Sequence, residues 1–401
     1  MPRPLSGLYK KETASSGTWI DAAFHSCKDC TDFEFHLLSF DKRIDQIQTY
    51  SAYRHQGYVV PHNDIKKHLL NLKSHIKPDI VQLWGTEHDY MLAVVELFYD
   101  IPKIAYIQGV ARNIAKNYMA GISWWDSIKH ISLKDICRHA WISARKKDML
   151  RLADIEEKVL QACQAVILEN DWCEDQIKVI TPNIKVYRSK LPLKDVFFNY
   201  RWDASKMIPH TIFTNAGGYP IKGHHTLFEA LHYVVQQYPD TILYIPGHSR
   251  LGSGFTNWSR RSSYENILSE MARRYGISNN IIYTGILNSD EMAKKLIECN
   301  VFALPSWVEN HSSSLLEAMV VGTPCAASIA GGAMTTMIHQ ENGLCHNPQD
   351  AECLAWNIIR IFKYPRLASK LSEGARKQNS VRRINLLTDF SSIYFQTLNE
   401  I

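Results

Sequence analysis

Two glutamates eight residues apart enclose a stretch of this chain whose residue types could bind a charged ligand. They are Glu309 and Glu317 in PSWVENHSSSLLEAMVVGTPCAAS, which spans residues 305–328. Three consecutive small polar residues lie between them, Ser312, Ser313 and Ser314. The pattern predicts a helix that begins among these serines and stops at Gly322.

The first turn of this helix would be an anion site, because its backbone N–H groups lack partners and the helix dipole places partial positive charge there. Glu317, about one turn further on, would reach the same pocket, where a ribose hydroxyl suits its carboxylate. Glu309, on the loop before the helix, would face the other end of the ligand. This arrangement suits a nucleotide sugar, and the alternative is that both glutamates are surface or helix-terminal charges.

A second stretch, TNAGGYPIKGHHTLFEAL, joins the end of a predicted strand to a glycine turn and then to a helix. Gly217 and Gly218 would let the backbone approach a ligand closely, and Lys222 would supply a point charge for a diphosphate. Taken alone, this is a weak glycine-loop signal, and it is not a Walker A motif.

Short apolar runs alternate with helical patterns along most of the chain, which is typical of βαβ units and parallel sheets. We expect an α/β fold with two doubly wound, Rossmann-like domains that face each other across a cleft and bind ligands at the carboxyl ends of their strands. The expected domains cover residues 1–200 and 201–380. A C-terminal helix over 381–401 is expected to pack back on the first domain.

The start of the chain departs from this pattern. A doubly wound domain normally opens with its most buried strand, yet MPRPLSGLYKKETASSGTW contains no apolar run before the glycine loop at Gly17. We therefore expect the first strand of the N-terminal domain to be missing. A truncated or misassigned start is favoured over a domain built without that strand.

The composition describes a folded protein, since apolar residues make up 45% of the 401 residues and charged residues 21%. The absence of an apolar run of about 18 residues and of a signal-peptide pattern predicts a cytoplasmic protein. Nine scattered cysteines argue against a disulfide framework. Cys27 and Cys30 form a C-x2-C without a second pair at zinc spacing, so no metal site is expected.

The two stretches described above, with YTGILNSDEMAKKLIECNVFALPS between them, resemble the donor-binding half of glycosyltransferase family 4. They most resemble the bacterial members that build capsule, lipopolysaccharide or other surface polysaccharides. Order and spacing agree across roughly residues 210–362. HIKPDIVQLWGTEHDYMLA and IPKIAYIQGV resemble the first half of the same family more loosely. The resemblance implies a GT-B fold, a retaining mechanism, and neither a metal nor another cofactor in the site.

The resemblance also implies roles for residues of this chain. Lys222 and Glu309 would be the catalytic pair, with the lysine on the diphosphate and the glutamate on the sugar, while Glu317 binds ribose hydroxyls. A fixed cation and helix N–H groups would stabilise the charge of the departing diphosphate. The implied donor-binding residues are Gly17, Gly217, Gly218, Lys222, Ile286, Glu309, Asn310, His311, Ser312, Ser313, Ser314, Leu315 and Glu317.

Three features depart from the family pattern. The turn NAGGYPIK lacks the arginine that many relatives carry, Gln108 stands where relatives often have a histidine, and the first strand is missing. The absent arginine and the absent first strand favour one alternative, a catalytically degenerate paralogue that binds a nucleotide or a partner. A second alternative is a GT-B-fold sugar-nucleotide epimerase.

Four residues at the carboxyl ends of two adjacent predicted strands are expected near the acceptor or the transferred sugar: Glu87, His88, Gln108 and Gly109. His88 could act as a base, although a lone histidine is more often structural. Retaining members of the family do not clearly need a base, because the leaving phosphate can take the proton.

Residues 122–151 form a basic segment in which apolar residues recur at helical spacing, namely Leu133, Ile136, Cys137, Ala140, Trp141 and Ala144. The segment also holds Trp124 and Trp125, and this combination suits the surface of an anionic membrane. The alternative is an ordinary amphipathic helix packed on the first domain with a solvated basic face. No nucleic-acid-binding module is recognisable, so no nucleic acid partner is expected.

Together these features predict a retaining hexosyltransferase that uses a nucleotide-diphosphate sugar, with UDP as the nucleotide by family habit. The expected acceptor is a saccharide, or a lipid-linked saccharide if the basic segment attaches the protein peripherally to the inner face of the cytoplasmic membrane. The expected setting is the synthesis of surface polysaccharide.

Overall fold

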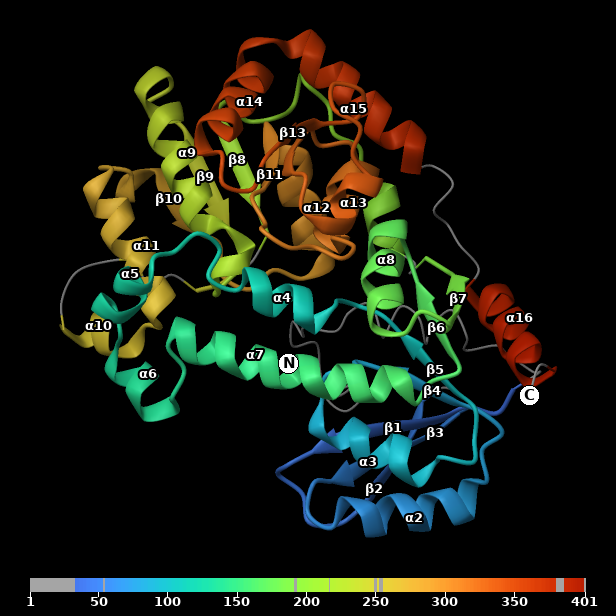
Figure 1. Ribbon diagram of the computed structural model, residues 1–401. Helices are drawn as coiled ribbons and strands as arrows, with labels where there is room; N and C mark the ends of the chain where they lie inside the picture. The colour runs from blue at the N-terminus through green and yellow to red at the C-terminus, as the bar shows by residue number, and fades with distance from the viewer. Residues whose placement is uncertain are drawn as a thin grey trace. The chain divides into compact units, whose positions relative to one another are not determined.

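The computed structural model describes residues 33–52, 55–190, 193–215, 217–248, 251, 255–379 and 386–399. The chain divides into two compact units, whose elements are labelled in Figure 1. The first unit takes the described parts of Met1–Ala111, Arg151–Leu193 and Arg382–Ile401, and the second those of Arg112–Leu150 and Lys194–Val381. The structure does not describe residues 1–32. The predictions for Gly17, for Cys27 and Cys30, and for the first strand therefore lie outside the described residues.

The first unit contains two sheets among its described residues. In the smaller sheet, of order β1-β3-β2, β3 pairs parallel to β1 and antiparallel to β2. The larger sheet is parallel throughout, in the order β4-β5-β6-β7. The strands are β1 (His36–Asp41), β2 (Gln48–Ala52), β3 (His55–Pro61), β4 (Val81–Trp84), β5 (Lys103–Tyr106), β6 (Ala165–Leu168) and β7 (Lys185–Arg188).

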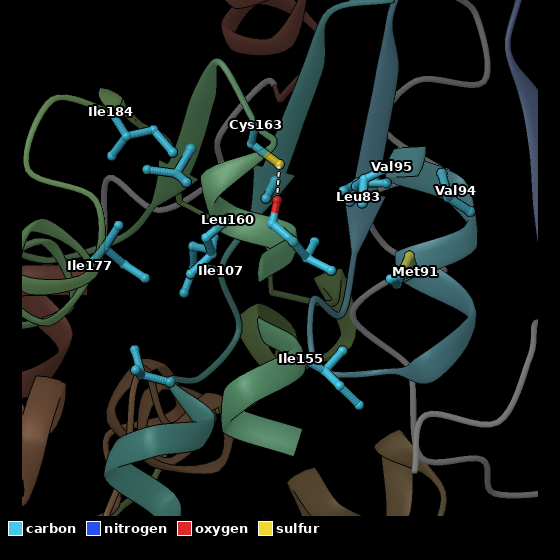
Figure 2. Packing of buried hydrophobic residues seen from close by; sticks show 14 of the residues in the cluster. Leu83, Met91, Val94, Val95, Ile107, Ile155, Leu160, Cys163, Ile177 and Ile184 are labelled. Atoms are coloured by element: carbon cyan, nitrogen blue, oxygen red, sulfur yellow. Dashed lines mark hydrogen bonds between the residues drawn. The ribbon is translucent and has the colours of Figure 1, made fainter. Parts of the chain in front are cut away.

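Side chains that alternate along β5 and β6 build separate clusters on the two faces of the larger sheet. One cluster contains Ala105 and Val166 and is shown in part in Figure 2. The other contains Ile104 and Ile167 and packs against Phe390 of α16. The helices of this unit are α2 (Ile65–Ile76), α3 (Asp89–Leu97), the C-terminal part of α7 (Ile142–Gln161), α8 (Asp171–Ile180) and α16 (Leu386–Asn399).

The second unit is built on one six-stranded sheet in which every pairing is parallel, in the order β10-β9-β8-β11-β12-β13. This is the order of a doubly wound nucleotide-binding sheet, and the direction of winding reverses between β8 and β11. The strands are β8 (Thr211–Thr214), β9 (Ile242–Ile245), β10 (Ile281–Tyr283), β11 (Val301–Leu304), β12 (Cys325–Ser328) and β13 (Leu344–His346).

The helices and short 3-10 turns of this unit lie before, between and after these strands in the sequence. They are α4 (Ala111–Asn117), α5 (Trp124–Lys129), α6 (Leu133–Arg138), the start of α7, η2 (Asp195–Asn199), η3 (Pro220–Lys222), α9 (His224–Gln237), α10 (Phe255–Arg260), α11 (Ser263–Arg274), η4 (Ser278–Asn280), α12 (Ser289–Glu298), α13 (Ser313–Val321), η5 (Gly331–Thr335), α14 (Ala351–Lys363) and α15 (Pro365–Asn379). None of the helices in the described part of the chain is both long and apolar enough to cross a bilayer.

One expected boundary differs from the structure. We expect the basic segment to belong to the first domain, whereas residues 112–150 group with the second unit. The physical reason is a set of polar contacts with α11. The most buried of these joins Asp135 to Ser263, whose backbone N–H and hydroxyl both donate to the aspartate.

Candidate functional site

The candidate site of the second unit lies where β8 and β11 are neighbours. The winding of the sheet reverses between these two strands, and doubly wound sheets bind their ligands at the carboxyl ends of the strands at such a switch point. The loop after β8 carries the glycine turn and Lys222, and the loop after β11 carries Glu309 and leads into α13. The two stretches chosen from the sequence therefore meet at one end of one sheet.

Two glycines make this meeting close. Gly223 has a φ of +70°, and a Cβ at this position would lie 1.9 Å from the carbonyl oxygen of Pro305. At Gly217, a Cβ would lie 2.6 Å from the Cβ of Lys222. Neither position accepts a side chain without a backbone shift, so glycine at both allows the turn to pack against the loop after β11. Gly218, in contrast, has no neighbour that would obstruct a Cβ.

Lys222 and Glu309 form an ion pair, with 2.7 Å between Nζ and Oε1. Their side chains are only 20% and 9% exposed, so both charges are largely removed from water. Burial alone would lower the pKa of Lys222, but the Glu309 carboxylate and the Tyr219 hydroxyl together outweigh burial and hold the pKa above its usual value. The lysine is therefore charged at pH 7, with the glutamate as its counter-ion.

The first turn of α13 begins as the sequence predicts. Ser312 caps the helix, and its hydroxyl accepts a hydrogen bond from the N–H of Leu315 at 3.4 Å. The helix ends at Gly322, which has a φ of +90°. Asn310 and Ser312 are buried, His311 and Ser314 are partly buried, and Ser313 is exposed. The predicted helix is thus confirmed, and its capping residue Ser312 follows Glu309 of the ion pair by three residues.

Glu317 lies inside α13, one turn beyond the serines. The side chain keeps some exposed surface, yet the protein packed around its carboxyl raises the pKa to about 8, against a small opposing effect of the Lys194 cation. The carboxyl is thus largely protonated at pH 7. In that state it can donate to, as well as accept from, a hydroxyl group such as those of a ribose.

Ile286 is the predicted donor-binding residue that comes from a third loop. It follows the carboxyl end of β10, an edge strand of the same sheet, and its side chain is 59% exposed. The structure records no contact that ties it to the ion pair.

Sequence reasoning missed residues that pack against Trp307 and so support the loop after β11. The ring of Trp307 stacks on His225 at a centroid distance of 6.0 Å, and a Cβ on Gly121 would lie 2.8 Å from the Trp307 ring. The Nε2 atom of His225 lies 2.8 Å from the carbonyl oxygen of Ala120. Burial lowers the pKa of His225 to about 4, so the neutral ring donates from Nε2 and accepts at Nδ1 from the Tyr264 hydroxyl.

The residues expected on the acceptor side all lie in the first unit. Glu87 and His88 follow β4, whereas Gln108 and Gly109 follow β5, and these two strands pair in parallel. Their carboxyl ends therefore lie side by side. The structure places Nε2 of His88 3.7 Å from Oε1 of Glu87, which is too long for a hydrogen bond.

Glu156 of α7 braces both of these loops. Its side chain is buried, with Oε1 accepting from the Thr86 hydroxyl at 2.9 Å and Oε2 accepting from the N–H of Ala111 at 2.7 Å. The sequence contained a signal for this residue. Glu156 shares a helical stripe with the buried Ala153 and Leu160, a position where a solvated glutamate is not expected.

Within the described ranges, no group of three or more histidine, cysteine, aspartate or glutamate side chains is arranged to hold a metal ion.

Part of the second unit is similar to a known protein family. Residues 209–378 match the family model of the glycosyl transferases group 1. The putative glycosyltransferase YtcC of Bacillus subtilis is 30% identical over 160 residues, which are 39% of this chain and 38% of that protein. Mannosylfructose-phosphate synthase of Agrobacterium fabrum is 26% identical over 161 residues, which are 40% of this chain and 34% of that protein. The chain thus matches less than two fifths of either relative's length.

Solved structures with the same fold match almost the whole chain. Sucrose-phosphate synthase from Thermosynechococcus elongatus superposes with a TM-score of 0.71 at 16% identity, over 96% of this chain and 95% of that one. HepE from Anabaena, in complex with UDP-glucose, gives a TM-score of 0.66 at 15% identity, over 97% and 98%. The fold is therefore GT-B, with two Rossmann-like domains, as the sequence predicts. Within this fold, residues 209–378 are the part of the chain that is similar to the glycosyl transferases group 1.

The ion pair predicts strong coupling between its two residues. Lys222→Ala and Glu309→Ala should each lower the free energy of unfolding, because each leaves one largely buried charge without its partner. The double variant should lose less than the sum of the two, by about 1–3 kcal/mol. A double-mutant cycle in urea measures this. The exposed pair of Lys294 and Asp290, also 2.7 Å apart, is the matched control and should couple by less than about 1 kcal/mol. Additive losses at Lys222 and Glu309 would contradict the structure.

The raised pKa of Glu317 predicts a particular dependence of stability on pH. The folded protein holds this proton up to about pH 8, whereas the unfolded chain releases it near pH 4.5, the usual pKa of a glutamate. The contribution is therefore fully present below pH 4.5 and is lost as pH rises through 8. Glu317→Gln should remove this loss, so that the stability of the variant relative to the wild type rises between pH 5 and pH 8.5 by up to a few kcal/mol.

Urea unfolding across this pH range provides the measurement, and the exposed Glu341→Gln serves as the control. A difference between Glu317→Gln and the wild type that stays constant with pH would show that the carboxyl is already ionised at neutral pH in the folded protein.

The bracing role of Glu156 predicts a local effect. Glu156→Ala should leave the Thr86 hydroxyl and the Ala111 N–H buried without an acceptor, at a cost of about 2–4 kcal/mol in the free energy of unfolding. Hydrogen exchange at Ala111 should accelerate, whereas the exposed Asp154→Ala on the same helix should change neither quantity. Unchanged exchange at Ala111 in Glu156→Ala would show that the glutamate does not hold this loop.

Proposed function

We propose that this protein is a retaining hexosyltransferase that moves a hexose from a nucleotide-diphosphate sugar, with UDP favoured, to a saccharide or lipid-linked saccharide. We place the reaction in the cytoplasm, in the synthesis of bacterial surface polysaccharide such as capsule or lipopolysaccharide. The observation that carries the proposal is the buried pair of Lys222 and Glu309, located where the winding of the sheet reverses in a region that matches the glycosyl transferases group 1.

The ligands bound in structurally similar proteins support a nucleotide-sugar donor. HepE was solved with UDP, with UDP and glucose, and with UDP-glucose, and it shares the fold of this chain over nearly its full length. The pneumococcal O-GlcNAc transferase GtfA, which also shares the fold, was solved with UDP and GlcNAc. A uridine diphosphate sugar is therefore the first donor to test, and the identity of the sugar stays open.

Donor binding would change the partner of Lys222. A diphosphate that binds at this site can replace Glu309 as the counter-ion of the lysine, with the N–H groups at the start of α13 as further donors. The released Glu309 carboxylate would then be free to accept hydrogen bonds from hydroxyls of the sugar. Glu317, from further along α13, would bind the ribose hydroxyls.

The transfer step follows from the same charges. The bond between the anomeric carbon and the diphosphate oxygen breaks, a bond from the acceptor oxygen forms on the same face, and the acceptor proton passes to the leaving phosphate. Lys222 stabilises the negative charge that develops on the diphosphate, so the chain itself supplies a cation for which other enzymes use a metal ion. On the acceptor side, we propose Glu87, His88, Gln108 and Gly109 as the residues near the acceptor or the transferred sugar.

Two other functions would use the same donor site. A degenerate paralogue would bind the donor without turnover, and the missing arginine in the glycine turn favours this alternative. A sugar-nucleotide epimerase would convert the donor without any saccharide acceptor.

The proposal predicts binding of one donor among UDP-glucose, UDP-GlcNAc, UDP-galactose and GDP-mannose in calorimetric titrations. Glu317→Ala should weaken this binding by about tenfold or more, because the ribose loses a hydrogen-bonding partner. Lys222→Ala should lower turnover more than it weakens binding. Turnover, followed by release of the nucleotide, should persist in EDTA, and Glu341→Ala is the control.

Different outcomes separate the alternatives. Binding without turnover on any saccharide acceptor would favour the degenerate paralogue, and a new sugar nucleotide formed without acceptor would favour the epimerase. If the folded protein binds none of the four donors, the proposed function is wrong.

A further inference from the structure

The helix α6 is amphipathic in the reverse sense, because it buries polar residues and exposes apolar ones. Asp135 and the capping residue Ser132 are 1% and 0% exposed, whereas Leu133 and Ile136 are 43% and 53% exposed. This contradicts the alternative in which Leu133, Ile136 and Cys137 form the packed face of an ordinary amphipathic helix. An apolar face turned toward water needs a partner.

Polar contacts with α11 fix this orientation. Oδ2 of Asp135 accepts from both the N–H and the hydroxyl of Ser263 at 2.5 Å, and the Ser132 hydroxyl donates to the carbonyl oxygen of Arg261 at 2.6 Å. Rotating α6 to bury Leu133 would strip a buried carboxylate of its hydrogen bonds, which costs more than leaving a leucine exposed. The exposure is therefore a stable property of the fold.

The short helix α5 also exposes apolar side chains and is tied to the same neighbour, α11. His130 and Lys129 both contact Glu270 of α11, at 2.9 and 3.1 Å. Figure 1 shows α5 and α6 beside α10 and α11. We call the exposed apolar side chains of α5 and α6 the apolar patch, which consists of Trp124, Trp125, Ile128, Leu133 and Ile136.

Exposed cations accompany the apolar patch. Arg138 and Lys147 are exposed, whereas the exposed Lys129 and Arg145 are each paired with a carboxylate, that of Glu270 and that of Asp148. Tryptophans beside lysine and arginine are the composition of segments that bind at the interface of an anionic bilayer, where each cation contributes about 1 kcal/mol. A second copy of the chain fits less well, because a symmetric contact would bring these like charges together.

We propose that α5 and α6 dock the protein on an anionic lipid surface through the apolar patch, with the neighbouring cations facing the lipid headgroups. Trp124 and Trp125 are the anchors, since they are 55% and 73% exposed and their rings lie edge to face. Docking itself does not depend on sugar transfer. Only the consequence that the acceptor is lipid-linked rests on the proposed function.

Flotation of the full chain with phospholipid vesicles tests the docking. The wild type should bind vesicles of phosphatidylcholine and phosphatidylglycerol in equal parts, and it should bind pure phosphatidylcholine vesicles much more weakly. The double variant Trp124→Ser/Trp125→Ser should lower the partition coefficient by about tenfold or more, and Arg138→Glu should lower it by several fold. The matched control is Trp356→Ser, which removes a 50% exposed tryptophan from α14 and should leave binding unchanged.

Two further measurements make the result unambiguous. Brominated acyl chains should quench the tryptophan fluorescence of the wild type and not that of the double variant, and circular dichroism shows whether each variant is folded. The proposal is overturned if the wild type does not float with anionic vesicles, or if the double variant floats as well as Trp356→Ser does. It is also overturned if the patch variants only dissociate a dimer, as measured by light scattering. Donor titration in solution is independent of these results and tests the proposed function separately.

Discussion

Lys222 and Glu309 hold opposite charges 2.7 Å apart, where both side chains are largely removed from water. Neither charge would be stable there alone, because an unpaired buried ion loses its hydration without compensation. The glycine at position 223 lets the turn pack against Pro305, and this packing brings the two loops close enough for the pair to form. We propose that a diphosphate replaces Glu309 as the partner of the Lys222 cation in the bound state.

Glu317, which we propose binds the same ligand, differs from Glu309 in its charge. With a pKa of about 8, it adds little negative charge at neutral pH to a pocket that we propose binds a diphosphate. The loop that carries Glu309 is in turn supported by Trp307, which packs on His225 and against Gly121. Residues 112–150 thus stabilise the donor-side loop with one end, while α5 and α6 present the apolar patch with the other.

Several of these features could be predicted from the sequence because they rest on local patterns. The alternation of apolar runs and helices indicated parallel α/β sheets, and the serines followed by Gly322 predicted the bounds of α13. The ion pair was not predicted, since pairing across 87 residues depends on which loops the sheet brings together. The orientation of α6 was not predicted either. The helical spacing of its apolar residues shows that it has an apolar face, but it does not show whether that face packs against the protein or is exposed. The buried Glu156 could have been predicted, because it interrupts a stripe of apolar residues on one face of α7.

If a diphosphate competes with Glu309 for Lys222, removing the Glu309 carboxylate should strengthen the binding of UDP, and the variant Glu309→Gln tests this. UDP carries no hexose, so any contact of Glu309 with the sugar is left out of the measurement. Calorimetry should show that Glu309→Gln binds UDP about tenfold more tightly than the wild type, because Lys222 has lost its competing anion. The affinity for uridine should stay unchanged, as should the affinity of Glu341→Gln for UDP. Weaker or equal binding of UDP by a folded Glu309→Gln variant would contradict the account.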